Sequence, residues 1–310
     1  MRRLTRVLAA WLLLASLAAG VRANEAGVLV VGSERSAAYE EAAQAALAEL
    51  SRAGELRREA QFLTLAEFAL ARSTAPRLYI ALGVDACLAL ARNPGTAPLL
   101  CTLLPRTSFE RVLRESGRRP GATLSALYLN QPPGRQLDLM RLALPGARRV
   151  GVLWGTDAQF AEPLLEAAAQ VRGLKLVGVT VRPDEPVYSG LKKLLDESDV
   201  LLAVANPQIY NSNTIQNILL TSFRAQVPML AFSPAYVRAG ALLAVYSTPA
   251  QIGQQAGALA RGVLQGQPLA APQYPLQFEV SVNEHVARSL GLSLDALSLT
   301  ERLRRLERGP

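Results

Sequence analysis

The chain has 310 residues, of which half are apolar and 19% are charged, and its formal net charge is +8 at pH 7. This length holds one large or two ordinary domains, and the composition is that of a globular protein with a substantial core. It excludes a disordered chain. The basic residues near the C-terminus alternate with Glu301 and Glu307 at helical spacing. We therefore expect a solvated terminal helix and no nucleic-acid partner.

Residues 1–23 have the pattern of a secretory signal peptide. Arginines at positions 2, 3 and 6 precede an apolar run over 7–19, and Val21 and Ala23 suit cleavage before Asn24. The alternative is an uncleaved membrane anchor, although the run is short for a bilayer span. The pattern predicts an exported, periplasmic protein that is soluble and only mildly basic after cleavage.

Short apolar runs alternate with helical patterns along the rest of the chain. The first half predicts strands over 28–32, 78–83, 99–104 and 123–129, and helices over 37–53 and 84–92. The pattern restarts after Pro132-Pro133, with strands over 149–153, 174–181, 200–204 and 229–232, and helices over 136–144, 157–171 and about 215–223. Such alternation predicts parallel β-α-β units. We predict an α/β fold with two Rossmann-like lobes, each built on a parallel sheet, joined by a hinge.

The last part of the chain has too few elements for a third domain. It predicts strands over 241–246 and 278–282 and a helix that opens at Thr248-Pro249. We expect these elements to complete the two lobes by crossing between them, with 240–248 carrying the chain back across the hinge. The predicted lobes are 24–129 plus about 240–275, and 130–239 plus about 276–300, followed by a C-terminal tail over 301–310.

The sequence offers little that could do chemistry. His285 is the single histidine, and Cys87 and Cys101 are not at metal-ligand spacing. The two cysteines are either buried apolar residues or a disulfide, which export permits. Neither glycine-rich nucleotide motif is present. We predict no catalytic residue, no metal, no cofactor and no enzymatic activity; the alternative is an exported enzyme that uses scattered carboxylates.

Polar, aromatic or glycine residues follow the predicted strands in both halves. Ligands of open parallel sheets bind at the carboxyl ends of strands, where hydroxyls, amides and helix N-termini hold anions and aromatic rings stack on planar groups. Each residue alone reads as a helix cap or turn, but their recurrence in both halves predicts two facing walls of a cleft. The predicted ligand-binding residues are Ser33, Arg35, Ser36, Gly83, Val84, Asp85, Pro105 and Arg106 in the first half, and Trp154, Asn206, Ser233 and Tyr236 in the second.

Several motifs in the second half carry a resemblance to a known family. They are Asn206-Pro-Gln-Ile-Tyr-Asn211, Thr214-Ile215, Ile218-Leu-Leu-Thr-Ser222, Val227-Pro228, Phe232-Ser233, Ala235-Tyr-Val237, Gly240-Ala-Leu242 and Leu290-Gly-Leu292. In these motifs the chain resembles the periplasmic substrate-binding proteins of ABC transporters that include the tryptophan/tyrosine-type binding proteins. The resemblance spans nearly all of the mature chain and is strongest after Pro186. Tyr210, within the first motif, joins the predicted ligand-binding residues.

The resemblance implies the type I periplasmic-binding fold, in which a small-molecule solute is trapped between two lobes and delivered to a membrane permease. The alternative is a periplasmic sensing or interaction protein with a degenerate cleft, whose partner is a sensor protein. Two departures argue against an aromatic amino acid as the ligand. Asn206 stands where related sequences often carry an acidic residue, and the Ser33–Ser36 loop is unlike that of the amino-acid-binding members.

Overall fold

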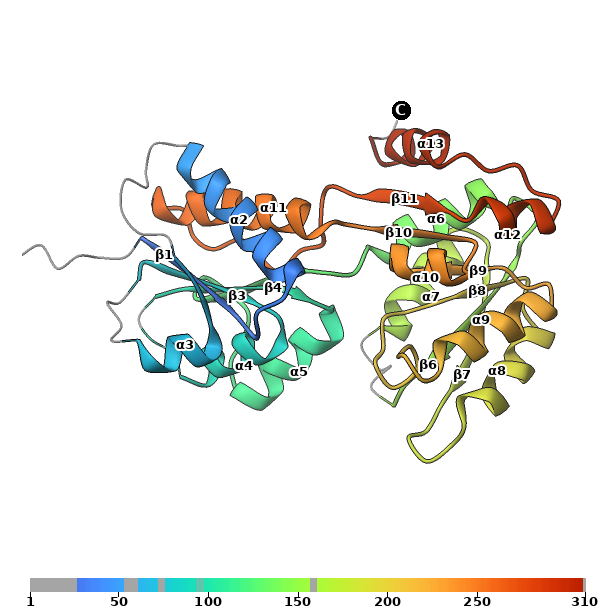
Figure 1. The fold of residues 1–310 in the computed structure, drawn as a ribbon, viewed down its shortest axis with the longest axis horizontal. Coiled ribbons are helices and arrows are strands. Elements are labelled where there is room, and N and C mark those ends of the chain that lie inside the picture. Colours follow the sequence, from blue (N-terminus) through green and yellow to red (C-terminus); the bar gives the residue numbers. More distant parts are fainter. Residues whose placement is uncertain are drawn as a thin grey trace, which may run out of the picture.

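The computed structural model describes residues 27–52, 61–71, 76–93, 95, 97–156 and 161–308. Two α/β lobes lie side by side and are joined by extended segments (Figure 1). Within these described ranges, no helix combines the length and apolar character needed to span a bilayer. The predicted signal peptide lies outside the described residues.

The first lobe is built on a parallel five-stranded sheet in the order β2-β1-β3-β4-β5. Alternate residues of β1 belong to two separate cores: Val28 and Val30 pack with α2 and α11, whereas Leu29 and Val31 pack with α4 and α5. Coverage of both faces explains why β1, β3, β4 and β5 are almost entirely apolar and buried, unlike the edge strand β2. The elements are β1 Val28–Gly32, α2 Ala37–Arg52, β2 Gln61–Thr64, α3 Leu65–Leu70, β3 Leu78–Leu82, α4 Val84–Arg92, β4 Leu99–Leu104, α5 Arg106–Ser116, β5 Leu124–Tyr128 and α11 Pro249–Leu264.

The second lobe has a six-stranded sheet in the order β11-β10-β9-β8-β6-β7, in which only the edge strand β11 is antiparallel. One face is covered by α6, α7 and α13 and the other by α8, α9 and α10. The elements are α6 Pro133–Ala143, β6 Arg149–Trp154, α7 Glu162–Val171, β7 Lys175–Thr180, α8 Val187–Asp196, β8 Val200–Leu202, α9 Ile215–Arg224, β9 Met229–Ala231, α10 Pro234–Ala239, β10 Leu243–Tyr246, β11 Glu279–Val282, α12 Glu284–Ser289 and α13 Ala296–Arg308.

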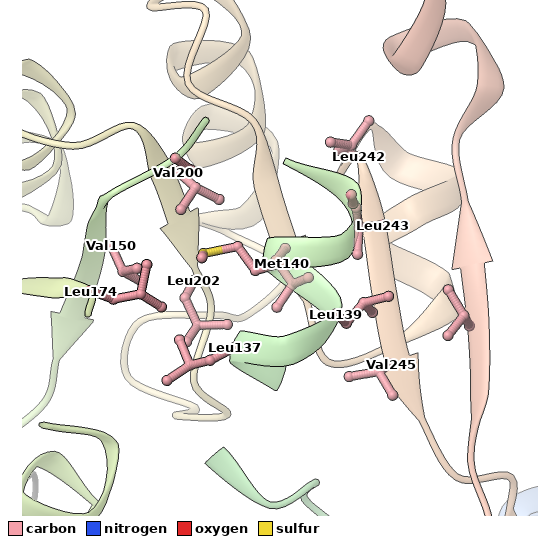
Figure 2. Close-up of a cluster of buried hydrophobic side chains, with 14 of the residues drawn as sticks. Leu137, Leu139, Met140, Val150, Leu174, Val200, Leu202, Leu242, Leu243 and Val245 are labelled. Carbon is pink, nitrogen blue, oxygen red and sulfur yellow. The ribbon is translucent and has the colours of Figure 1, made fainter. Parts of the chain in front are cut away.

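Helix α6 anchors the second lobe next to the hinge. Figure 2 shows Leu139 and Met140 of α6 lying among Leu202 and Leu243 of the sheet, and all four side chains are buried. The helix follows directly on the segment that enters the lobe from β5. Any movement of that segment relative to the lobe is therefore resisted by this packed core.

The prediction of two α/β lobes with parallel sheets is confirmed, but two segments lie elsewhere than expected. Strand β10 pairs with β9 and β11, so 240–246 belongs to the second lobe and the chain crosses back only at Ser247–Thr248. The apolar pattern identified the strand but not its neighbours. The expected tail is part of α13, which buries Leu299 and Leu303 against the second lobe. The expected helix over 157–171 begins at Glu162, and residues 157–160 lie outside the described part.

The chain crosses between the lobes three times, at 129–132, 247–248 and 274–278; residues before 274 still pack on the first lobe, where Gln273 pairs with β5. Side chains join these crossings. Gln131 Nε2 donates to Ser247 Oγ at 2.9 Å, and Ser247 Oγ donates to the Gln277 carbonyl at 2.5 Å. Arg135 Nη1 donates to Gln131 Oε1 at 2.7 Å and to the Pro275 carbonyl at 2.9 Å. The hinge is thus a hydrogen-bonded unit rather than three independent linkers.

Cys87 and Cys101 form a disulfide, with their Cα atoms 5.5 Å apart. Both residues are fully buried, and the bond joins α4 to β4. Of the two alternatives for these cysteines, the structure has the bonded one. A disulfide fits the expectation of an exported protein.

Candidate functional site

A cleft lies between the lobes at the carboxyl ends of strands from both sheets. One part of it, the Trp154 pocket, encloses about 570 Å³, and the adjoining Ser233 pocket encloses about 1320 Å³, both including space open to solvent. The Ser233 pocket shares five lining residues with the Trp154 pocket: Pro105, Asn130, Gln131, Ala205 and Phe232. The two pockets are parts of one cleft, and the crossing segment that holds Asn130 and Gln131 lines both.

The end of β4 is turned toward the cleft by a β-bulge. The register against β5 shifts between Thr102 and Leu104, and Leu103 has φ 54°. A bulge bends its strand and re-aims the residues that follow. A left-handed backbone at a non-glycine residue costs about 1–2 kcal/mol. Pro105 and Arg106, which come next, both line the Trp154 pocket.

Arg106 begins α5 and is held from several sides. Its backbone N–H donates to Asn130 Oδ1 at 2.9 Å, and Nη1 lies 3.5 Å from the Tyr274 hydroxyl oxygen. Nε is 3.6 Å from Glu110 Oε1 and is buried without a hydrogen-bond partner. The guanidinium also lies 5.9 Å from the centre of the Tyr128 ring. Burial raises the pKa of Tyr128 to about 12, so this ring is neutral at pH 7.

The wall of the second lobe is aromatic. Trp154 is 3% exposed, and its indole lies over Gly178 of β7, where a Cβ would come within 2.7 Å of Nε1. The indole Nε1 is buried without a hydrogen-bond partner. Phe232, at the end of β9, also lines the pocket. The absence of a side chain at position 178 therefore leaves room for the tryptophan ring at the cleft.

Two of the predicted tyrosines support Phe232 from behind. The Phe232 ring centre is 5.0 Å from that of Tyr236 and 5.9 Å from that of Tyr210, in edge-on contacts. Tyr236 donates its hydroxyl to the Tyr210 carbonyl at 3.3 Å. Tyr210 is buried, burial raises its pKa, and its hydroxyl has no hydrogen-bond partner. The pair fixes the orientation of the ring that reaches the cleft.

The structure brings four of the predicted site residues into the cleft lining: Pro105, Arg106, Trp154 and Ser233. Asn206 follows Ala205, which lines both pockets, and its Oδ1 accepts from the Gln208 N–H at 2.9 Å. That bond is a turn-forming contact, which is the ordinary role of such an asparagine. Any part played by Asn206, Tyr210 or Tyr236 in binding stays a prediction.

Six predicted residues of the first lobe do not line either pocket and have local roles. Ser33 Oγ donates to the Leu82 carbonyl and accepts from the Ala86 N–H, which ties β1 to the start of α4. Arg35 is an exposed residue paired with Glu67 and Glu40. The remaining four, which begin or cap helices, are Ser36, Gly83, Val84 and Asp85.

The sequence interpretation missed four polar residues that two crossing segments and the start of α6 supply. Asn130, Gln131, Gln136 and Tyr274 all line the Trp154 pocket. The first three flank Pro132-Pro133, where the sequence pattern restarts, and that position was their only signal. Tyr274 comes from the third crossing, which is distant in sequence, and carried no signal of its own.

The arrangement suits non-covalent binding. Among the described residues, no three His, Cys, Asp or Glu side chains gather as metal ligands would. His285 lies on α12, with its backbone N–H bonded to Asn283 Oδ1 and its Nδ1 3.1 Å from Arg288 Nη2. It lines neither pocket of the cleft.

Two lobes that meet at strand ends across a hinged cleft define the type I periplasmic-binding architecture. The chain belongs to the ABC transporter substrate-binding protein family, whose model matches residues 71–299. A search of curated protein sequences finds no match. The family and the fold predicted from the sequence are both confirmed.

Solved structures share the fold at low sequence identity. A ligand-free, open substrate-binding protein with adhesive properties from Clostridium difficile is 17% identical, with a TM-score of 0.68 over 87% of this chain and 96% of that one. A conserved domain protein from Vibrio cholerae is 20% identical, with a TM-score of 0.62 over 88% and 97%. An ABC domain in complex with L-Trp from Streptococcus pneumoniae is 15% identical, with a TM-score of 0.60 over 88% and 98%.

Proposed function

We propose that this protein is the periplasmic solute-binding component of an ABC importer, which holds a small molecule in the interlobe cleft and passes it to a membrane permease. The main support is that Pro105 and Arg106 of one lobe and Trp154 and Phe232 of the other line a single pocket. Membership of the family supports the transport role. The pattern of a signal peptide over 1–23 supports export.

Hinge closure is the proposed means of trapping the solute. Residues of both lobes and of all three crossing segments line the cleft, so rotation of one lobe about the crossings changes the size of the cleft. On closure, we propose that the loops after β1 and β3, with Ser33, Arg35 and Asp85, approach the second lobe. The similar structures include complexes with L-Trp and with D-arabinose, so the fold leaves the chemistry of the solute open.

Mass spectrometry of the mature protein, purified under native conditions from the periplasm, tests the proposal. We expect a co-purifying small molecule that stabilises the protein according to RT ln(1 + [L]/Kd), about 2.7 kcal/mol at 100 times Kd. Small-angle X-ray scattering should show a smaller radius of gyration with the molecule bound. Binding without compaction would contradict trapping by closure.

Matched phenylalanine variants locate the site. Phe232 lines both pockets of the cleft, whereas Phe223 on α9 is half-exposed and lines neither. Phe232→Ala should weaken binding of the co-purified molecule at least about tenfold, because it removes a ring from the wall, and Phe223→Ala should not. Equal effects of the two changes would rule out the cleft as the binding site.

If the protein instead serves a sensor, the ligand should promote its binding to a sensor domain and not to a permease.

A further inference from the structure

Arg106 is the only charged side chain among the described residues that line the Trp154 pocket. Glu110, its partner at 3.6 Å, does not line the pocket. At that separation the pair is an ion pair without a hydrogen bond, and the Arg106 Nε is left without a partner. Arg106 therefore lines the pocket as a cation that no carboxylate neutralises through a hydrogen bond.

The guanidinium is also held in place before any ligand arrives. The Tyr274 hydroxyl, the Tyr128 ring and Glu110 contact it from three sides. Its backbone N–H is bonded to Asn130, which fixes the start of α5. A planar guanidinium in a fixed orientation is suited to bidentate binding of a carboxylate.

The start of α5 also favours an anionic ligand. The helix runs over Arg106–Ser116, and its N-cap, Pro105, makes no side-chain capping bond. Thr107, in the first turn, lines the pocket together with Arg106. The first turn of a helix favours negative charge through its unpaired N–H groups and its dipole. The cation and the helix end thus favour an anionic group at one spot of the wall.

The rest of the pocket is mostly apolar. Its lining includes Pro133, Trp154, Leu164, Leu165, Val204 and Phe232. Its polar side chains besides Arg106 are Thr107, Asn130, Gln131, Gln136 and Tyr274. Both ends of the Gln131 amide are engaged in the hinge, and Asn130 Oδ1 and the Tyr274 hydroxyl are engaged with Arg106. A sugar would leave several hydroxyls without partners against such a wall, which is costly. An apolar, flat body fits the lining better.

We propose that the solute is an organic acid without an ammonium group, whose carboxylate binds Arg106 and whose apolar body lies against Trp154 and Phe232. The described lining of the Trp154 pocket holds no carboxylate to pair with an ammonium group, and a second cation beside Arg106 would be repelled. Glu41 lines the adjoining Ser233 pocket, where its carboxylate accepts from the Ala250 N–H at 3.2 Å. The inference rests on the proposed function and narrows it to one chemical class.

Matched sets of three compounds test the class by calorimetric titration of the mature protein. Indole-3-acetate, indole-3-acetamide and L-tryptophan share a ring and differ in charge, and phenylacetate, phenylacetamide and L-phenylalanine repeat the comparison; D-arabinose represents the sugars. We expect an acid to bind about tenfold or more tighter than its amide and its amino acid. Tighter binding of an amino acid, as a carboxylate elsewhere in the chain would cause, overturns the inference, as does binding of the sugar or of none of the acids.

Variants of two arginines on α5 assign the preference to Arg106. Arg106→Gln should abolish the preference for acid over amide, whereas Arg111→Gln, an exposed residue 3.9 Å from Glu115, should leave it unchanged. Arg106→Lys keeps the charge and should retain part of the preference for acid over amide. It serves as the test if the glutamine variant fails to fold. An unchanged preference in a folded Arg106→Gln protein contradicts the inference. If the protein becomes compact with a co-purified solute of another chemical class, the organic-acid inference is wrong but the proposed function stands. If no solute binds and no compaction occurs, both are wrong.

Discussion

Arg135 and Glu307 form a two-point ion pair that joins the first turn of α6 to the last turn of α13. Nε and Nη2 of the arginine donate to the two carboxylate oxygens at 2.5 and 3.0 Å. The arginine side chain is 6% exposed and lies 4.3 Å from the centre of the Phe278 ring. Because the same guanidinium also binds Gln131 and Pro275, the C-terminal helix is connected to the hinge.

Loss of the carboxylate at position 307 should destabilise the protein. Glu307→Gln leaves a buried arginine with weaker acceptors, and removal of one partner of a buried pair costs about 3–5 kcal/mol. Glu307 is 32% exposed, so solvent screening reduces the expected loss to about 2 kcal/mol. Urea denaturation measures it. The exposed pair Arg288–Glu284 is the control, and Glu284→Gln should cost less than about 0.5 kcal/mol; equal losses in the two variants would show that burial adds nothing.

Ser247 should hold the hinge crossings together. Its hydroxyl accepts from Gln131 and donates to the Gln277 carbonyl, so Ser247→Ala removes the side-chain bonds that tie the second crossing to the other two. We expect a loss of about 1 kcal/mol in stability and a broader distribution of interlobe distances in the ligand-free protein. Ser289→Ala, which removes an exposed hydroxyl on α12, should change neither quantity.

Spin labels on exposed positions of the two lobes measure the interlobe distances. Cysteines introduced at Arg111 and Tyr188 lie on the first and the second lobe, outside the cleft lining. If Ser247→Ala lowers stability but leaves the distance distribution unchanged, the hydroxyl stabilises a lobe and does not restrain the hinge.

At Leu103, the glycine variant should be more stable than the alanine variant, which is the reverse of the usual order of stability in a strand. In a strand, glycine is ordinarily less stable than alanine by about 0.5–1 kcal/mol. Leu103 has φ 54°, so alanine keeps the left-handed strain whereas glycine relieves it. We expect Leu103→Gly to be more stable than Leu103→Ala by about 1 kcal/mol. At the buried Leu100 of the same strand, alanine should be the more stable variant; the same order at both positions would exclude strain at the bulge.

The sequence predicts the lobes better than the cleft, for a physical reason. A strand buried on both faces is a continuous apolar run, which can be recognised from a few neighbouring residues, as in Leu99–Leu104. The neighbour of a strand is a nonlocal choice, and so β10 was assigned to the wrong lobe. Cleft residues such as Gln131 and Tyr274 meet only after three crossings have folded. Ser33 was predicted to bind ligand because it follows a strand, but its hydroxyl instead makes two hydrogen bonds that hold the first lobe together.

Removal of the disulfide should destabilise the first lobe. Cys87 and Cys101 are separated by 14 residues in sequence, and closure of a loop of this length stabilises by about 3 kcal/mol in the chain-entropy model. The double change to alanine should lower the free energy of unfolding by about 2–3 kcal/mol, measured in urea. Hydrogen exchange should report faster opening of β3 and β4, with β6 unchanged as the control. Equal acceleration in the two lobes would mean that they unfold as one unit.

Asp199 should make the stability of the second lobe depend on acid pH. Burial alone would raise the pKa of this carboxyl, but hydrogen bonds from the Arg149 side chain and from the backbone N–H groups of Arg148 and Arg149 outweigh it and lower the pKa to about 2. Because the pKa is lower in the folded state than its ordinary value of 3.8, the stabilisation is complete above about pH 4 and is lost as the pH falls toward 2.

Asp199→Asn should therefore cost about 1–2 kcal/mol at pH 7, a reduced value because the carboxyl is 28% exposed, and almost nothing near pH 2. Urea midpoints between pH 2 and pH 7 measure the difference between the two proteins. Asp184→Asn, at a 75% exposed carboxyl, is the control and should give a difference near zero at every pH. A gap between Asp199→Asn and the unsubstituted protein that persists at pH 2 would mean that the asparagine perturbs packing rather than removing a charge-assisted hydrogen bond.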